Sequence, residues 1–491
     1  MSFKKKALSG IFWSSIQTFG TQCVSFVISI ILARLLLPEE FGLIAMITVF
    51  MGIGNTLLNA GLGESLIRTK DPTEEDYSTV FFFNLIGSVI VYAIIYFSAP
   101  WIANFYKQPL LIDIVRWYSI VIVINAFSMI QVTRLTKQVD FKTQMKVSLP
   151  ATILAGILGV FLASEGFGVW SLVYMAIFRS VLDMLFLFYN TKWLPSLVFH
   201  VEKFKYHFSF GYKLTFSGLL DIVFNNAYHV IIGKYYQPAI LGFYDRANKL
   251  KNLPVQTLTT VISRVTYPIF AEFKDDNIRL KNAYQKVIQM LVFIIAPLLL
   301  ILSVLAEPLF SFLFTDKWLA AVPYFQIICW SGILYPVYAF NLNILKIKGR
   351  TDLFLKLEII KKVLFTSVLL FSVKFGIFGL LYGGVCFSLL AFYVNTYYTG
   401  KFINYKPFEQ IIDIVPIVFL AFISAVTVYF SDILLVSYFS KDILRLLVGS
   451  LVGAFTFLAL SYLLKIKPFF VLSQILKNND SSNQTVSPPD R

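Results

Sequence analysis

Three polar residues within an apolar stretch are the side chains of this sequence best placed to do chemistry. Asp221, Asn225 and His229 lie in the largely apolar segment 209–246, and on a continuous helix this spacing places all three on one face. A carboxylate, an amide and an imidazole can bind polar groups and exchange protons, but they cannot face hydrocarbon. The spacing therefore predicts that this face lines a water-filled cavity or contacts other helices.

Ionisable residues also interrupt other apolar segments. Arg179 and Asp183 lie one helical turn apart and are expected to pair, either as a structural ion pair or as part of a substrate or proton site. Arg264 has no carboxylate close to it in the sequence, which favours a role in a cavity. Asp221 is interpreted as an acid that lines a cavity and can change protonation there, or as one half of a buried ion pair. Asp221 and Asp183 are therefore the candidates for ion coupling.

The elements that must position these residues are membrane spans. The chain has 491 residues, of which 57% are hydrophobic and 14% charged, a balance that excludes a water-soluble fold. We predict an all-α polytopic membrane protein of about fourteen transmembrane helices. The expected spans are 10–37, 41–66, 79–99, 111–132, 147–164, 167–190, 209–235, 250–272, 286–306, 320–345, 354–374, 376–399, 411–430 and 443–464.

The distribution of charge predicts the orientation of these spans. The net charge of +15 comes from connections between spans and not from a basic domain, so no nucleic acid is expected as a partner. Lys and Arg are concentrated in the connections on the side of the N-terminus, which places both termini in the cytoplasm. The basic cluster around Arg246 is the exception on the outer side.

An internal repeat divides the chain. The run Arg34–Gly42 (RLLLPEEFG) resembles Lys234–Gly242 (KYYQPAILG) at an offset of 200 residues. Repetition after six spans predicts two pseudo-symmetric lobes. The expected domains are an N-terminal lobe (1–200), a C-terminal lobe (201–402), two appended spans (403–465) and a largely disordered cytoplasmic tail (466–491).

Polar faces recur in the repeated spans. Span two carries Asn55 and Asn59 one helical turn apart, and spans one, seven and eight also carry polar residues at helical spacing. We interpret these faces as the lining of a hydrated cavity between the lobes. The alternative is that they form hydrogen bonds that hold helices together.

Several kinds of chemistry leave no motif in this sequence. We find no phosphate-binding loop, no metal-binding spacing and no nucleophile motif, so no cofactor, no metal and no enzymatic activity are expected. Cys23, Cys329 and Cys386 fall inside apolar segments and are interpreted as small buried hydrophobic residues.

Three motifs resemble a known family. The runs Ala33–Gly42 (ARLLLPEEFG), Gly61–Asn84 (GLGESLIRTKDPTEEDYSTVFFFN) and Leu241–Pro254 (LGFYDRANKLKNLP) are similar to the polysaccharide-exporting branch of the multidrug/oligosaccharidyl-lipid/polysaccharide (MOP) flippase superfamily, which includes Wzx-type exporters. The resemblance implies alternating access in the bacterial inner membrane, with an undecaprenyl-diphosphate-linked oligosaccharide moved to the outer leaflet for lipopolysaccharide or exopolysaccharide synthesis. It also implies membrane lipids and other polysaccharide-assembly membrane proteins as partners.

The resemblance, together with the chemistry of a diphosphate and a sugar chain, selects the candidate binding residues. A diphosphate needs cations, and Arg offers a planar fork that matches phosphate, while sugars need amide partners. The candidates are Arg34, Asn55, Asn59, Arg68, Arg179, Asn225, Asn226, His229, Arg246 and Arg264. The alternative function is a cation-coupled drug or small-molecule antiporter of the same superfamily. A membrane glycosyltransferase or polymerase is disfavoured because no large outer loop is present.

Overall fold

The protein is described by a computed structural model that covers residues 3–59, 61–438 and 441–474. Within these ranges it contains helices and turns but no β-strand, which confirms the all-α prediction. Residues 467–474 are helical. The rest of the tail that the sequence predicts to be largely disordered, residues 475–491, lies outside the described residues.

The chain forms two compact units, residues 1–245 and 246–491, which are described separately. The predicted lobes divide at residue 200 instead, on the basis of the sequence repeat, and remain a prediction. The helices that begin in the first unit are α1 (Phe3–Leu35), α2 (Pro38–Asn59), α3 (Leu62–Arg68), α4 (Glu74–Tyr106), α5 (Leu111–Tyr118), α6 (Ile120–Gln138), α7 (Phe141–Ser164), α8 (Val169–Thr191), α9 (Val201–Asn225), α10 (Ala227–Tyr235) and α11 (Pro238–Glu272).

The second unit contains the rest of α11 and the helices that follow it. These are α12 (Asn277–Val304), α13 (Ala306–Phe314), the 3₁₀ helix η1 (Asp316–Ala321), α14 (Val322–Ile347), α15 (Thr351–Ser372), η2 (Val373–Phe375), α16 (Gly376–Ile403), α17 (Pro407–Tyr438) and α18 (Asp442–Leu463).

Eleven helical segments of the described residues are long and apolar enough to cross a membrane. They are Ser9–Leu35, Pro38–Arg68, Glu74–Tyr106, Leu111–Gln138, Phe141–Ser164, Val169–Thr191, Asn277–Val304, Asp316–Ile347, Thr351–Ile403, Pro407–Val436 and Asp442–Leu463. The segment 351–403 contains two helices, α15 and α16, which match two of the fourteen predicted spans. The predicted spans 209–235 and 250–272 fall on α9–α10 and α11, which are more polar and are not among the eleven.

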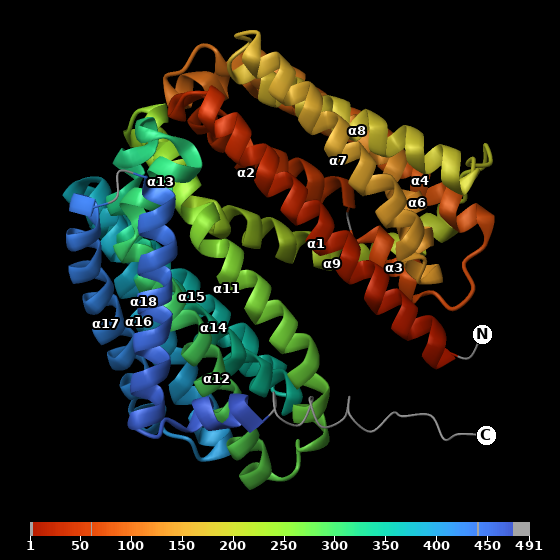
Figure 1. Cartoon of the computed structure of the whole chain (residues 1–491). Coiled ribbons are helices and arrows are strands. Elements are labelled where there is room, and N and C mark those ends of the chain that lie inside the picture. Colours follow the sequence, from red (N-terminus) through yellow and green to blue (C-terminus); the bar gives the residue numbers. More distant parts are fainter. Residues whose placement is uncertain (1–2, 60, 439–440, 475–491) are drawn as a thin grey trace, which may run out of the picture. The chain divides into compact units, whose positions relative to one another are not determined.

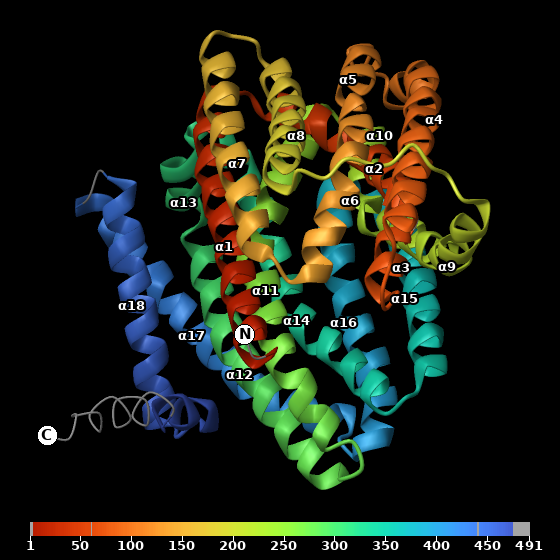
Figure 2. The same cartoon turned by 90° about the vertical axis from the view of Figure 1, so that its right-hand side faces the viewer.

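The first unit is built around long helices packed side by side. α1 packs along α7, α7 along α8, and α6 along both α4 and α8 (Figures 1 and 2). α9 contacts α2, α3 and α4. The start of α4 is set by a capping box, in which the Thr73 hydroxyl accepts from the backbone N–H of Asp76 while the Asp76 carboxylate accepts from the backbone N–H of Thr73.

The repeat seen in the sequence recurs in the helix boundaries. α1 ends at Leu35 and α2 begins at Pro38, while α10 ends at Tyr235 and α11 begins at Pro238. The two copies also pack reciprocally within the first unit. A Cβ atom on Gly42 would overlap the backbone carbonyl of Pro238, and one on Gly242 would overlap that of Pro38. Only glycine allows the two helix starts to approach this closely.

Polar side chains hold the helices of the second unit together. Asn395 on α16 donates to the backbone carbonyl of Tyr338 on α14 at 2.9 Å, and Thr399 donates to that of Asn341 at 3.0 Å. Arg445 on α18 forms a bidentate ion pair with a carboxylate on α17, with N–O distances of 3.0 and 2.8 Å. These residues fulfil the structural role that polar groups commonly have between membrane helices.

Candidate functional site

A polar cavity of about 480 Å³ lies within the first unit. Residues of α1, α2, α3, α6, α7 and α8 form its walls, and half of the lining residues carry an amide or a hydroxyl. The lining residues are Gln17, Asn55, Leu58, Asn59, Gly63, Glu64, Ile67, Asn125, Ser128, Met129, Val132, Thr133, Thr136, Gln144, Val147, Ser148, Asp183 and Leu187. The cavity therefore presents many neutral hydrogen-bonding groups and only two ionisable ones.

Three of the residues selected from the sequence line this cavity. Asn55 and Asn59 reach it from the last turn and a half of α2, and Asp183 reaches it from α8. The Oδ1 atom of Asp183 is buried and has no hydrogen-bond partner among the described residues. Its Oδ2 atom lies 3.8 Å from Nε of Arg179, so the predicted ion pair is present. Because one carboxylate oxygen has no partner among the described residues, Asp183 can bind a proton, or accept a hydrogen bond from a water molecule or a ligand.

The chain next to the cavity turns sharply at Gly61. This residue has a φ of 62°, in the left-handed region that favours glycine, and it connects α2 to α3. A Cβ atom on Gly61 would lie 2.7 Å from the carbonyl oxygen of Gly211 on α9. The turn therefore brings α9 against the end of the helix that carries Asn55 and Asn59.

The helix predicted to carry Asp221, Asn225 and His229 on one face is divided in the structure into two helices. α9 ends at Asn225 and α10 begins at Ala227. Asn226, between them, has a φ of −101° and a ψ of 6°, and its side-chain amide donates to the backbone carbonyl of Ile222 at 2.8 Å. This local hydrogen bond competes with helix continuation. Asp221 and Asn225 are exposed, whereas His229 is buried.

His229 is held by a carboxylate on the following helix. Its Nε2 atom lies 3.2 Å from Oδ1 of Asp245, and its ring lies edge-on to that of Tyr244 at 5.6 Å. Both partners are nearly buried, with 9% and 5% of their surfaces exposed for His229 and Asp245. The contact connects α10 to α11 and does not place His229 in the polar cavity.

The predicted arginines occupy different environments. Arg246 is buried, with its guanidinium 5.2 Å from the ring of Phe314 and 5.1 Å from that of Trp318. Arg68 is exposed and lies 4.4 Å from the ring of Phe210 on α9. Arg34 and Arg264 are exposed near the end of α1 and within α11. None of the predicted arginines lines the polar cavity.

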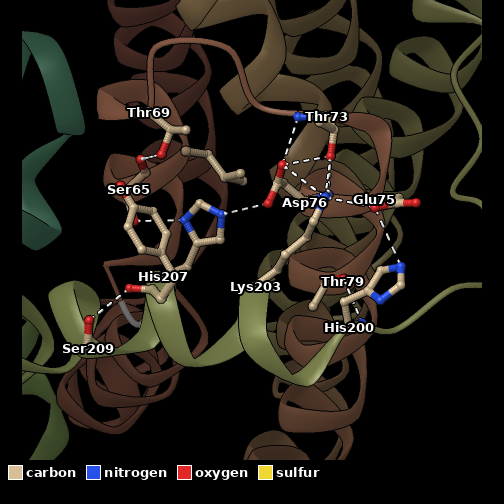
Figure 3. A network of polar contacts seen from close by, with 12 residues as sticks. Ser65, Thr69, Thr73, Glu75, Asp76, Thr79, His200, Lys203, His207 and Ser209 are labelled. Atoms are coloured by element: carbon tan, nitrogen blue, oxygen red, sulfur yellow. Dashed lines mark hydrogen bonds and ion pairs between the residues drawn. The ribbon is translucent and has the colours of Figure 1, made fainter.

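Figure 3 shows a second polar cluster, at the start of α9. Nδ1 of His207 lies 2.8 Å from the hydroxyl of Ser65, and its Nε2 lies 3.4 Å from Oδ1 of Asp76. Lys203 contributes an ammonium that lies 3.5 Å from Oδ2 of Asp76 and 2.8 Å from Oε2 of Glu75. The cluster connects the first part of α9 to α3 and to the first turn of α4.

His207 is fully buried, and it precedes the predicted span that begins at residue 209. Burial lowers the pKa of His207 below its ordinary value of 6.5, and the contact with Asp76 offsets only part of this effect. A neutral ring satisfies both partners, because Nδ1 accepts from Ser65 while the Nε2 proton is donated to Asp76. The pKa of the Lys203 amine, in contrast, is raised above its ordinary value by the hydrogen bond to Glu75.

Sequence reasoning missed much of the cavity lining. One face of α6 contributes four polar residues to the cavity. They are Asn125 and the residues three, eight and eleven positions after it, Ser128, Thr133 and Thr136. That spacing could have identified α6 as a cavity helix. The predicted cavity walls were spans one, two, seven and eight, and spans one and two contribute to this cavity, whereas α9, α10 and α11 do not.

The comparisons with known proteins agree with the motifs. The chain is 28% identical over 354 residues to "Teichuronic acid biosynthesis protein TuaB" of Bacillus subtilis (strain 168), covering 72% of this chain and 73% of that protein. It is 24% identical over 414 residues to "Lipopolysaccharide biosynthesis protein WzxC" of Escherichia coli (strain K12), covering 83% and 82%.

A solved structure has the same fold. It is the lipid II flippase MurJ in an inward closed conformation, with a TM-score of 0.71 and 16% identity, covering 92% of this chain and 98% of that one. The family model described as "Polysaccharide biosynthesis protein" matches residues 31–323. Because this match spans more than half of the chain, the protein belongs to the polysaccharide biosynthesis protein family, and the resemblance to polysaccharide exporters of the MOP superfamily is confirmed.

Proposed function

We propose that this protein is a flippase for an undecaprenyl-diphosphate-linked oligosaccharide. It moves the repeat unit from the cytoplasmic to the outer leaflet of the bacterial inner membrane by alternating access, for lipopolysaccharide or exopolysaccharide synthesis. Both termini lie in the cytoplasm in this proposal. The protein makes and breaks no covalent bond in the substrate, and an ion gradient drives the cycle.

The observation that carries the proposal is the amide and hydroxyl lining of the cavity in the first unit. Sugar hydroxyls donate and accept hydrogen bonds at once, and Asn, Gln, Ser and Thr side chains do the same. Because several such groups line one cavity among membrane helices, a polar chain can leave water without losing its hydrogen bonds. The names of the relatives, which concern teichuronic acid and lipopolysaccharide biosynthesis, support a glycan as the cargo.

The diphosphate needs a different environment from the sugars. No Lys or Arg is among the described residues that line the polar cavity, so these residues offer no cation to a diphosphate. Arg264 is exposed on α11 and can present its planar fork to phosphate oxygens. In the proposal the cavity of the first unit binds the glycan, and Arg264 of the second unit is proposed separately as a residue that binds the diphosphate.

One observation favours the alternative, a cation-coupled antiporter for drugs or other small molecules. The two ionisable residues that line the cavity, Glu64 and Asp183, are both acidic, as expected for a cationic cargo. However, the guanidinium of Arg179 lies next to Asp183 and offsets its charge, and Glu64 is exposed. The remaining lining is neutral, which fits a glycan better than a cation.

The proposal is tested in a strain that lacks this gene. We expect lipid-linked repeat units to accumulate on the cytoplasmic side, and wild-type protein to restore glycan export. The double variant Asn55→Leu/Asn59→Leu removes two amides from the cavity without adding charge, and we expect it to lower export about tenfold at matched protein levels, equal to a loss of ~1.4 kcal/mol.

The matched control is Asn190→Leu, because Asn190 is exposed near the end of α8 and does not line the cavity. Efflux of a cationic dye is measured in the same cells. Dye efflux by the wild type without any effect of the deletion on glycan export would refute the flippase and support the antiporter.

A further inference from the structure

A second cavity of the first unit is almost entirely apolar. It is a groove of about 540 Å³ between α2, α4 and α9. Among its lining side chains only Asn84, Tyr212 and Thr215 carry polar atoms. The lining residues are Leu57, Leu58, Phe83, Asn84, Ile86, Gly87, Ile90, Val91, Phe199, Phe208, Tyr212, Thr215, Phe216 and Leu219.

The groove and the polar cavity share a wall. Leu58, in the last turn of α2, lines both of them. Asn84, which lines the groove, donates from Nδ2 to the sulfur of Met129, which lines the polar cavity, at 3.2 Å. A ligand that occupied both would therefore need a polar part and an apolar part joined close to this wall.

The groove is open to the surroundings of the unit. Ile86 and Ile90 on α4 are 60% and 55% exposed, and Phe216 on α9 is 68% exposed. Because α4 is among the segments long and apolar enough to cross a membrane, its exposed apolar side chains are expected to contact lipid. A hydrocarbon chain can therefore enter the groove sideways from the bilayer without crossing water.

Gly87 keeps the middle of the groove open. A Cβ atom at this position would meet no atom within 4 Å, and Gly87 lies in the middle of α4 at no strained backbone angle. Glycine in a helix interior costs about 0.5–1 kcal/mol relative to alanine. Neither packing nor backbone geometry requires glycine at position 87. A role for the open space beside it would explain why glycine is present.

We propose that this groove binds the polyprenyl tail of the lipid-linked substrate while the glycan occupies the polar cavity. The proposal rests on the proposed function and adds a site for the apolar half of the cargo. Four phenylalanines, Phe83, Phe199, Phe208 and Phe216, present flat apolar faces to the branched chain. The tail is already in hydrocarbon, so the groove gains packing contacts but little hydrophobic free energy. Its role is to hold the tail beside the wall and so to present the head group to the polar cavity.

The first test fills the groove. Gly87→Phe places a ring in the open space, and we expect it to lower glycan export about tenfold, whereas Gly87→Ala leaves space and keeps at least about half of wild-type export, a change of under ~0.5 kcal/mol. The matched control is Val89→Phe, because Val89 is 50% exposed on the same helix and does not line the groove. Wild-type export by Gly87→Phe at equal protein levels would overturn the proposal.

The second test reads tail binding without any glycan. A p-benzoylphenylalanine photocrosslinker replaces Phe216 in the groove, or Leu214, which is 45% exposed and does not line it. With undecaprenyl phosphate as the probe, we expect crosslinking from position 216, loss of that product in the Gly87→Phe background, and little product from position 214. Equal competition by phosphatidylglycerol would show that ordinary lipid fills the groove and would refute a tail site.

The two tests separate this proposal from the proposed function. If wild-type protein fails to restore export in the deletion strain, the flippase proposal fails, and crosslinking still decides whether a polyprenyl chain binds. If wild-type protein exports glycan and Gly87→Phe does so equally well, the flippase stands and the tail site falls.

Discussion

Gly42 at the start of α2 packs directly against the backbone carbonyl of Pro238 at the start of α11, and Gly242 packs against that of Pro38 in return. The two contacts are related by the same offset of 200 residues as the sequence repeat. A pair of equivalent contacts between equivalent segments is the packing expected across a local twofold axis. The duplicated segments therefore meet each other at their most similar residues.

Alanine at Gly42 should destabilise the first unit. The added methyl group meets backbone, which cannot rotate away as a side chain can, so the helix starts must separate at a cost of about 1–3 kcal/mol. We expect a lower melting temperature of the detergent-purified protein. Gly87→Ala is the control, because its methyl group enters open space. Equal melting temperatures for Gly42→Ala and wild type would show that the contact is looser than described.

Asp183 is expected to couple transport to the ion gradient. Sequence reasoning placed Asp221 first, but Asp183 is the one of the two that lines the polar cavity and has a buried, unused carboxylate oxygen. Asp183→Asn keeps the shape and removes the charge, so we expect export to fall about tenfold, ~1.4 kcal/mol in rate, and to lose its dependence on the proton or sodium gradient. Asp221→Asn is the matched control. The reverse pattern would return the coupling role to Asp221.

The stability of the protein should depend on pH through His207. Ser65, Asp76 and Lys203 face this ring, and burial keeps its pKa below 6.5 in the folded state. The unfolded chain therefore binds more protons near and below pH 6.5, so stability is retained above that pH and lost as pH falls through the ordinary pKa toward the lowered one.

Thermal melting at pH 7.5 and pH 5.5 checks this expectation. His207→Gln cannot titrate, so the drop in melting temperature between the two pH values should be smaller than in wild type. His200→Gln is the control, because the side chain of His200 is 46% exposed beside Glu75. An unchanged drop in His207→Gln would assign the acid sensitivity to other groups.

Substitution of Arg246 should lower the stability of the protein, whereas substitution of Arg264 should lower its transport activity. Arg246 is buried beside Phe314 and Trp318, so Arg246→Ala should lower the melting temperature, with about 2 kcal/mol from the lost cation–π contacts. Arg264 is exposed, so Arg264→Ala should leave melting unchanged and abolish export. Arg264→Lys should restore export only in part, because an ammonium lacks the planar fork. Full export by Arg264→Ala would remove Arg264 from the diphosphate path.

The sequence predicted features that depend on local pattern. The boundaries at Pro38 and Pro238 follow from two similar runs, and the cavity positions of Asn55 and Asn59 follow from their spacing on an apolar helix. Ion pairing between Arg179 and Asp183 also follows from their spacing of one turn. In each case the residues that matter lie within a few turns of each other.

Contacts between helices that are far apart in the sequence could not be predicted. Ser65 and His207 are 142 residues apart in the sequence, and no pattern in either segment identifies the other as its partner. Periodicity shows that α6 has a polar face but not that this face meets Gln144 and Ser148 of α7 around one cavity. The sequence also does not show that the side-chain amide of Asn226 bonds to the carbonyl of Ile222 and that the regular helix is interrupted at this residue.

The interruption at Asn226 makes the two copies of the duplicated segment mechanically different. Phe26, the residue 200 positions earlier, lies within α1, which is continuous from Phe3 to Leu35. The second copy consists of two shorter helices, α9 and α10, joined at Asn226, whose φ of −101° and ψ of 6° depart from helical values although its backbone N–H still bonds to the carbonyl of Ile222. A straight rod resists bending along its whole length, whereas a jointed one can change direction at a single peptide. Any bending of the paired segments during a transport cycle is therefore expected to concentrate at Asn226 and to leave its counterpart in the first copy rigid.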